Sequence, residues 1–299
     1  MLIPSPTLPA LKGRFPFRLG TTSYILPDAM APNVRFTGPF VDEVELVLFE
    51  SRFADNLPTS KEIEELNNLA REYDLTYNVH LPTDTFLGHP DSETRRQACD
   101  TILRFYERTL PLQPTLYVLH LEKNPPGDTK HLNTPDWLGN LLSSLEYLLE
   151  RGMQGNLIGV ENIDYPFRWI YPLIRELGLN ICLDIGHLLV QQEDLTPYIE
   201  AYGDEIAMVH LHGVAGQKDH RSLLEISHDN WRIISDFLTY YRGGVSLEVF
   251  SLEDLTASME KMSTLATSAK DDTFENIAKK STNTGNLVKS QHHPSTSSG

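Results

Sequence analysis

Eight short apolar runs, each of strand length, alternate along this chain with longer segments of helical periodicity. The runs cover residues 17–24, 43–49, 75–81, 115–121, 156–162, 179–185, 206–212 and 244–250. Strands separated by helices pair in parallel, and eight of them over roughly 250 residues favour an α/β fold closed into a (β/α)8 TIM barrel. An open doubly wound sheet would normally carry a glycine-rich phosphate turn after its first strand, and LGTTSY is not such a turn.

The same pattern divides the chain into one catalytic barrel domain over residues 17–266, with an N-terminal extension over 1–16. From residue 267 the sequence becomes rich in Ser, Thr, Asn and Lys and has few large apolar residues. Such a segment cannot bury a core, so 267–299 is predicted to be a disordered tail.

Composition narrows the range of partners and compartments. A formal net charge of −16 suits a nucleic-acid-binding protein poorly, because Lys and Arg supply most of the affinity for a phosphate backbone. Two isolated cysteines, Cys99 and Cys182, make no disulfide framework. The N-terminus does not resemble a signal peptide, and no apolar run approaches the roughly 20 residues that span a bilayer. We expect a cytoplasmic protein without a membrane span; the sequence does not indicate its oligomeric state.

The residues at the ends of the predicted strands indicate metal binding. Six of the eight predicted strands, the third to the eighth, end in residues that can bind a metal: His80, His120, Glu161, Asp184 with His187, His210 with His212, and Glu248. In a parallel barrel these ends converge on one mouth. Buried carboxylates repel one another and resist ionisation, and no Lys or Arg stands at these strand ends to compensate them. The set therefore predicts divalent metal ions, and mixed His/Asp/Glu ligation suits Zn²⁺, Mn²⁺ or Fe²⁺.

Other residues near the mouth have less specific signals. Asp219 and His220 lie in the loop expected after the seventh strand. They are candidates either for binding a metal or substrate or for a solvated loop pair without a function. Ser23 and Tyr24, at the end of the first strand, are candidates for substrate contact or for core and capping roles. Glu45, on the second strand, is equally open between substrate binding and a structural role.

This arrangement resembles the xylose isomerase-like TIM barrel superfamily over roughly residues 17–266. That superfamily includes sugar isomerases and epimerases and the endonuclease IV type of DNA-repair enzyme. The resemblance to the isomerases and epimerases implies one metal held by Glu161, Asp184, His210 and Glu248. The resemblance to endonuclease IV implies further metals, with His80 and His120 sharing Glu161 as a bridging ligand and His187 binding a third ion. The chain departs from the nuclease pattern after the seventh strand, where Asp219 and His220 are adjacent instead of Asp-x-His.

Two segments, RLGTTSYILPDAMAPNVRF and VDEVELVLFES, are more similar to the cobamide-remodelling phosphodiesterases of bacteria, the CbiR family. Those enzymes cut the nucleotide loop of cobamides to release a cobinamide. The leading hypothesis is thus a metal-dependent hydrolase that cleaves a phosphodiester in a small molecule, a cobamide or other corrinoid, with two or more metals per chain. Its expected catalytic residues are Glu161, His187 and Glu248.

Three alternatives remain at this point. A single-metal sugar isomerase or epimerase would use Glu161 and Glu248 both as metal ligands and to shuttle protons between adjacent carbons. An endonuclease IV-like nuclease would act on abasic DNA. A non-catalytic barrel would only capture a corrinoid or a sugar.

Overall fold

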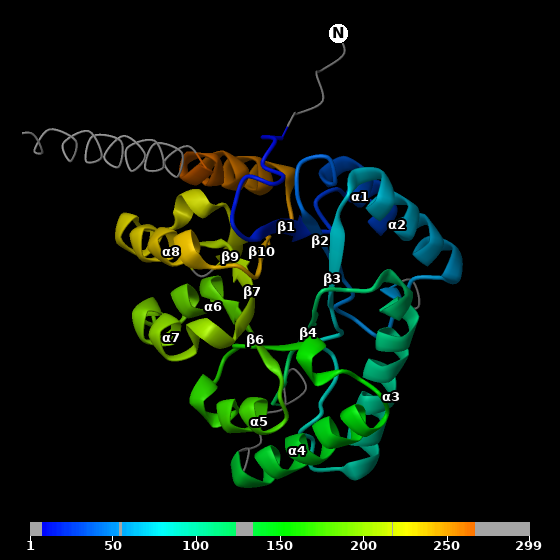
Figure 1. Cartoon of the computed structure of the whole chain (residues 1–299). Coiled ribbons are helices and arrows are strands. Elements are labelled where there is room, and N and C mark those ends of the chain that lie inside the picture. Colours follow the sequence, from blue (N-terminus) through cyan, green and yellow to red (C-terminus); the bar gives the residue numbers. More distant parts are fainter. Residues whose placement is uncertain (1–7, 54–55, 124–133, 217, 267–299) are drawn as a thin grey trace, which may run out of the picture.

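Eight parallel strands close into a barrel in the order β1-β10-β7-β6-β5-β4-β3-β2 (Figure 1). The computed structural model describes residues 8–53, 56–123, 134–216 and 218–266. The barrel strands are Arg18–Thr22 (β1), Glu43–Val47 (β2), Thr76–His80 (β3), Tyr117–Leu119 (β4), Ile158–Glu161 (β5), Asn180–Asp184 (β6), Ile206–Leu211 (β7) and Gly244–Leu247 (β10). Each lies within one of the eight predicted runs, so the predicted TIM barrel is confirmed.

Helices surround the barrel and pack their apolar faces on its outer surface (Figure 1). They are Met30–Thr37 (α1), Ser60–Tyr73 (α2), Ser92–Thr109 (α3), Thr134–Glu150 (α4), Tyr171–Glu176 (α5), Ile185–Val190 (α6), Leu195–Tyr202 (α7) and His228–Tyr240 (α8), followed by helical residues 252–266. The start of α2 illustrates why they form where they do. Thr59 and Glu62 form a capping box, which satisfies backbone N–H groups that would otherwise lack acceptors.

The interior of the barrel is unusually polar. TIM barrels are normally filled by branched apolar side chains, but here a small apolar cluster occupies only part of the interior: Leu116, Val118, Cys182 and Met208. Glu43, inside the amino-terminal end, is buried and accepts hydrogen bonds from Arg18 and from Thr76, Thr115 and Asn78. This network closes the end of the barrel opposite the predicted metal ligands.

A two-stranded antiparallel sheet follows β7 and corrects one prediction. Its strands are Gly213–Ala215 (β8) and Lys218–Arg221 (β9), so Asp219 and His220 lie on a strand and not in a loop. The sequence KDHR has no apolar alternation, which is why periodicity misses this strand. Gly213, at the start of β8, permits the close approach of the chain just after β9, since a Cβ there would collide with the carbonyl oxygen of Ser222.

The chain segments outside the barrel are only partly described. Leu8 and Leu11, in the predicted N-terminal extension, are buried in the core that covers the barrel. The boundaries of the three predicted segments stay predictions, and the predicted disordered tail lies outside the described residues. Within the described ranges, no helix combines the length and the apolarity that crossing a bilayer requires. The expected cytoplasmic location stays a prediction.

Candidate metal centre

The predicted metal ligands lie together at the carboxyl end of the barrel. His80, Glu161 and Asp184 are the last residues of β3, β5 and β6. His210 lies near the end of β7; His120 and Glu248 directly follow β4 and β10, and His187 lies on α6. His120 and His187 keep some exposure, and the other five side chains are buried. The shared edge of the parallel strands therefore brings all seven side chains to one place.

A first group consists of His80, His120 and Glu161, whose ligand atoms all lie within 4.8 Å of one another. The Nε2 atoms of His80 and His120 are 3.4 and 3.1 Å from Oε2 of Glu161. Two imidazole nitrogens thus face the same carboxylate oxygen.

A second group consists of Glu161, Asp184, His210 and Glu248, again with all ligand atoms within 4.8 Å. Nδ1 of His210 lies 3.1 Å from Oε2 of Glu248 and 3.4 Å from Oε2 of Glu161. Glu161 belongs to both groups through one oxygen, which is the place a bridging carboxylate would occupy.

A third group consists of His187, His212 and His220. The ring centroids of His212 and His220 are 4.2 Å apart, and His187 lies 5.9 Å from His212. Gly186 makes room for this group, because a Cβ at that position would collide with the His212 ring. The side chain of Asp219 is 45% exposed and is not part of the group.

The donor atoms of these groups fit bound cations. Five of them are buried and have no hydrogen-bond partner among the described residues: Oε2 of Glu161, Nε2 of His120, both ring nitrogens of His210 and Oε2 of Glu248. In the described part of the chain, every ion-pair partner of Glu161, Asp184 and Glu248 is a histidine. Buried acceptors crowded together with no Lys or Arg beside them are costly unless protons or cations lie between them. A divalent cation would satisfy them.

The same crowding shifts the pKa values of the protein without metal. Burial by itself lowers the pKa of His120, but the carboxylates of Glu161 and Glu122 raise it to about 10. Burial likewise opposes the charge on His212, and Asp184 raises the pKa of this imidazole to about 9. Burial raises the pKa of Glu161, but the neighbouring His120 and His210 hold it well below its usual range.

The remaining predicted residues occupy different environments. Ser23 is buried, and its Oγ accepts a hydrogen bond from the backbone N–H of Val47. Tyr24 is 57% exposed beside the mouth. Glu45 is fully buried, with Oε1 3.1 Å from Nε2 of His210. Substrate contact by these three residues stays a prediction.

One residue of the centre was not predicted. Cys182 lies two residues before Asp184 and so points from β6 to the same side, into the barrel. Its sulfur lies within 4.8 Å of ligand atoms of Glu161 and His210. Strand alternation is the signal that could have found it, since the side chain two positions before a strand-end ligand lies directly beneath it.

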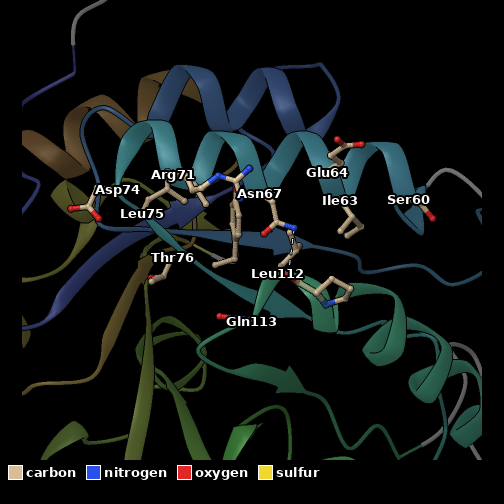
Figure 2. A pocket seen from close by; sticks show the side chains of 13 residues that line it. Ser60, Ile63, Glu64, Asn67, Arg71, Asp74, Leu75, Thr76, Leu112 and Gln113 are labelled. Atoms are coloured by element: carbon tan, nitrogen blue, oxygen red, sulfur yellow. Dashed lines mark hydrogen bonds between the residues drawn. The ribbon is translucent and has the colours of Figure 1, made fainter.

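A separate groove of about 750 Å³ lies on the outer wall of the barrel, between α2 and the short 3-10 helix Leu110–Leu112 (η2) (Figure 2). Asn67 points from α2 toward η2, where its amide donates a hydrogen bond to the carbonyl of Pro111. The groove reaches Thr76, the first residue of β3, whereas His80 ends that strand. It contains none of the metal-ligand candidates.

A closed parallel barrel with buried His, Asp and Glu side chains at its carboxyl end defines a TIM barrel with a candidate metal centre. Residues 41–268 match the family described as xylose isomerase-like TIM barrel, and the chain belongs to this family. No protein with a curated description matches the chain in sequence.

Solved structures of similar fold include epimerases and a nuclease. A D-tagatose 3-epimerase-like protein is 21% identical with a TM-score of 0.68, covering 86% of this chain and 100% of its own. The 3-keto-D-glucoside 4-epimerase YcjR from E. coli is 16% identical with a TM-score of 0.64, covering 84% and 99%. Endonuclease IV from Thermus thermophilus is 18% identical with a TM-score of 0.62, covering 83% and 98%. At these identities the likeness extends to the fold alone.

Proposed function

We propose that this protein is a metal-dependent phosphodiesterase that hydrolyses a small-molecule phosphodiester. The observation that carries the proposal is the sharing of Glu161 Oε2 between two ligand groups, with a third group of imidazoles beside them. A single-metal enzyme has no need of the first and third groups. Several adjacent cations suit the hydrolysis of a phosphodiester, because both the attacking and the leaving oxygen carry negative charge.

The protein's own residues would divide the work at this centre. His80, His120 and Glu161 would hold one ion, and Glu161, Asp184, His210 and Glu248 a second. When bound, such ions supply Lewis-acid stabilisation of a phosphoryl group and activation of water. Glu161 fixes the spacing of the two groups because its carboxylate belongs to both.

His187 is the member of the set that faces the mouth, with one fifth of its side chain exposed. Burial by itself lowers its pKa, but Asp184 and Glu161 raise it above the usual value. It would either hold a third ion with His212 and His220, or keep a proton near the leaving oxygen.

The substrate we propose is the nucleotide loop of a cobamide, cut to give a cobinamide. Its support is the resemblance of residues 18–36 and 41–51 to the cobamide-remodelling phosphodiesterases. The net charge of −16 adds to this support, because it disfavours duplex DNA as an alternative phosphodiester.

The experiment uses the protein reconstituted with Mn²⁺, Zn²⁺ or Fe²⁺ under reducing conditions and incubated with a complete cobamide. We expect chromatography to detect a cobinamide and the released nucleotide. Glu161→Ala should abolish the cleavage. An absence of products with all three metals would contradict the cobamide proposal.

A sugar epimerase is the second candidate, and the epimerases among the similar folds favour it. There the second ligand group alone would hold one ion, and Glu161 and Glu248 would move protons between adjacent carbons. His80 and His120 would then bind substrate or support the structure. Endonuclease IV activity also fits the ligand groups, and failure to nick abasic duplex at low salt would remove it. Tight corrinoid or sugar binding without turnover would instead support a non-catalytic barrel.

A further inference from the structure

We propose that Glu45 is a positioning residue that fixes the orientation of His210 from inside the barrel. Its carboxylate faces Nε2 of His210, and a hydrogen bond accepted from Nε2–H would leave the Nδ1 lone pair of that ring toward the second ligand group. This inference rests on the metal-binding part of the proposed function and goes beyond it, since Glu45 would touch neither substrate nor metal.

The contacts place His210 between two sets of acidic oxygens. Its Nε2 lies 3.1 Å from Oε1 of Glu45, and its Nδ1 lies 3.1 Å from Oε2 of Glu248. Both Glu45 and His210 are fully buried. A carboxylate accepts hydrogen bonds only. With a cation between Nδ1 and the carboxylates of the second ligand group, the ring would carry its hydrogen on Nε2, where Glu45 is the acceptor.

Four of the other five candidate imidazoles have the opposite orientation; the fifth, His212, accepts a hydrogen bond at Nδ1 from the backbone N–H of His220. Each of four rings has an acceptor beside Nδ1, at 3.0 to 3.1 Å: Leu81 O for His80, Glu122 Oε1 for His120, Asn162 O for His187 and Glu248 O for His220. Those rings therefore present Nε2 to a metal. His210 is reversed, with Nδ1 toward the ligand group, and needs an acceptor at Nε2. Of the described residues that pair with His210, only Glu45 lies on that side.

Glu45 has no role elsewhere that accounts for a buried carboxylate. Among the described residues, neither of its oxygens has a hydrogen-bond partner, and its only ion-pair contact is His210. The next inward-facing acid on the same strand, Glu43, is different. It is held by Arg18 and three polar side chains at the opposite end of the barrel. Glu43 therefore provides a matched control.

The test compares Glu45→Leu and Glu45→Gln with Glu43→Gln, by titrating each metal-free protein with Zn²⁺ in a calorimeter and counting bound ions by native mass spectrometry. Removing an orienting partner typically weakens metal binding about 10- to 100-fold. We expect a loss of that size at one site in Glu45→Leu. Glu45→Gln should stay within about threefold of the wild type, because its amide oxygen still accepts the hydrogen bond. Glu43→Gln should bind all ions as the wild type does.

Three results would overturn the proposal. Wild-type affinity in Glu45→Leu would remove the role altogether. Equal losses of metal affinity in Glu45→Gln and Glu45→Leu would indicate that Glu45 binds the metal directly. Its position permits this, since its carboxylate lies within 4.8 Å of ligand atoms of His80, His210 and Glu248. An equal loss in Glu43→Gln would indicate a general effect of barrel polarity.

A measurement on the unmutated protein covers the case in which Glu45→Leu does not fold. The ¹⁵N imidazole signals of His210 in the Zn²⁺-loaded protein can be identified because they are missing from the spectrum of His210→Gln. We expect these signals to be those of a ring protonated at Nε2. Protonation at Nδ1 would contradict the proposal. None of these experiments uses a substrate. A protein that binds ions as described but cleaves no phosphodiester would therefore contradict only the proposed function.

Discussion

At the scale of single residues, the first ligand group separates the two leading functions. His120 contributes only to this group, through its Nε2 atom 3.1 Å from Glu161. We expect His120→Ala to bind one ion fewer than the wild type. Its phosphodiesterase activity should fall by at least about 100-fold, because one of the two cations that would stabilise the phosphoryl group is lost. Native mass spectrometry and a cleavage assay measure both effects.

His228→Ala is the control for that variant. His228 begins α8 and its side chain is 91% exposed. This control should keep the full number of ions. If His120→Ala also keeps it, His120 is a substrate-binding or structural residue, as the epimerase alternative requires.

Gly186 is a second residue with a specific consequence. A methyl group there would overlap the His212 ring, and the overlap must displace either the imidazole or the backbone of α6. We expect Gly186→Ala to lose the ion of the third group and to lower the free energy of unfolding by about 1–3 kcal/mol. Metal counting and thermal unfolding measure these effects.

The matched control is Gly139→Ala, a helical glycine in α4 with open space around its Cβ position. It should leave metal binding intact and stabilise the protein by about 0.5–1 kcal/mol, since alanine is the better helix former. A third ion bound normally by Gly186→Ala would exclude His212 from the centre.

At the scale of elements, the β8–β9 hairpin determines which residues complete the third group. It returns the chain so that His220 lies against His212, and the Nδ1 atom of His220 reaches the carbonyl of Glu248. Asp219, the residue before, has its side chain largely in solvent. Of the adjacent residues Asp219 and His220, only His220 is thus a ligand candidate, and His212 is the second one in this group. The nuclease pattern Asp-x-His would instead offer both of its residues.

This geometry makes a prediction that differs from the nuclease pattern. We expect Asp219→Ala to bind every ion with wild-type affinity, because its carboxylate lies outside the group. His220→Ala should lose one ion. Calorimetric titration with Zn²⁺ distinguishes them, and a loss of one ion in Asp219→Ala would place that carboxylate in the centre.

The hairpin also marks where sequence-based prediction stops. His80, Glu161 and Asp184 could be predicted because the ends of parallel strands meet at one edge whatever the loops do. The place of His220 depends on a turn whose residues carry no periodic signal. Glu45 was recognised only as ambiguous, because its partner lies on a strand more than 160 positions later in the chain.

At the scale of the whole molecule, the fold was predictable and the barrel interior was not. Eight apolar runs separated by helical segments specify a (β/α)8 barrel, and each run contains a strand. Alternation along a strand predicts which side chains point into the barrel but not their chemistry: Glu43, Asn78 and Ser246 are polar and buried. The partners of Glu43 come from different parts of the chain, so only the closed barrel shows how its charge is compensated.

The crowded centre makes metal binding and stability depend on pH in opposite directions. In the metal-free folded protein the pKa of His120 is about 10, against an ordinary value of 6.5. Because the pKa of His120 is higher in the folded protein than in the unfolded chain, its protonation stabilises the metal-free protein. This stabilisation is complete below about pH 6.5 and is lost as the pH rises toward 10. Metal binding needs the neutral ring, so affinity should rise over the same range and loading should release protons.

Calorimetric Zn²⁺ titrations at about pH 7.5, in two buffers with different enthalpies of ionisation, measure the proton release. At least one proton per chain is expected, because His120 and His212, with pKa values of about 10 and about 9, are both charged at that pH. Identical heats in the two buffers would contradict this picture of the metal-free centre.

The most direct test of the central claim is the number of divalent ions bound per chain. Native mass spectrometry of the protein reconstituted with Zn²⁺ or Mn²⁺ should show two or three ions, because Glu161 joins two ligand groups and a third lies beside them. Glu161→Ala should lower this number. A single ion, bound equally well after His80 and His120 are replaced, would contradict the multinuclear phosphodiesterase and leave the sugar epimerase as the better account.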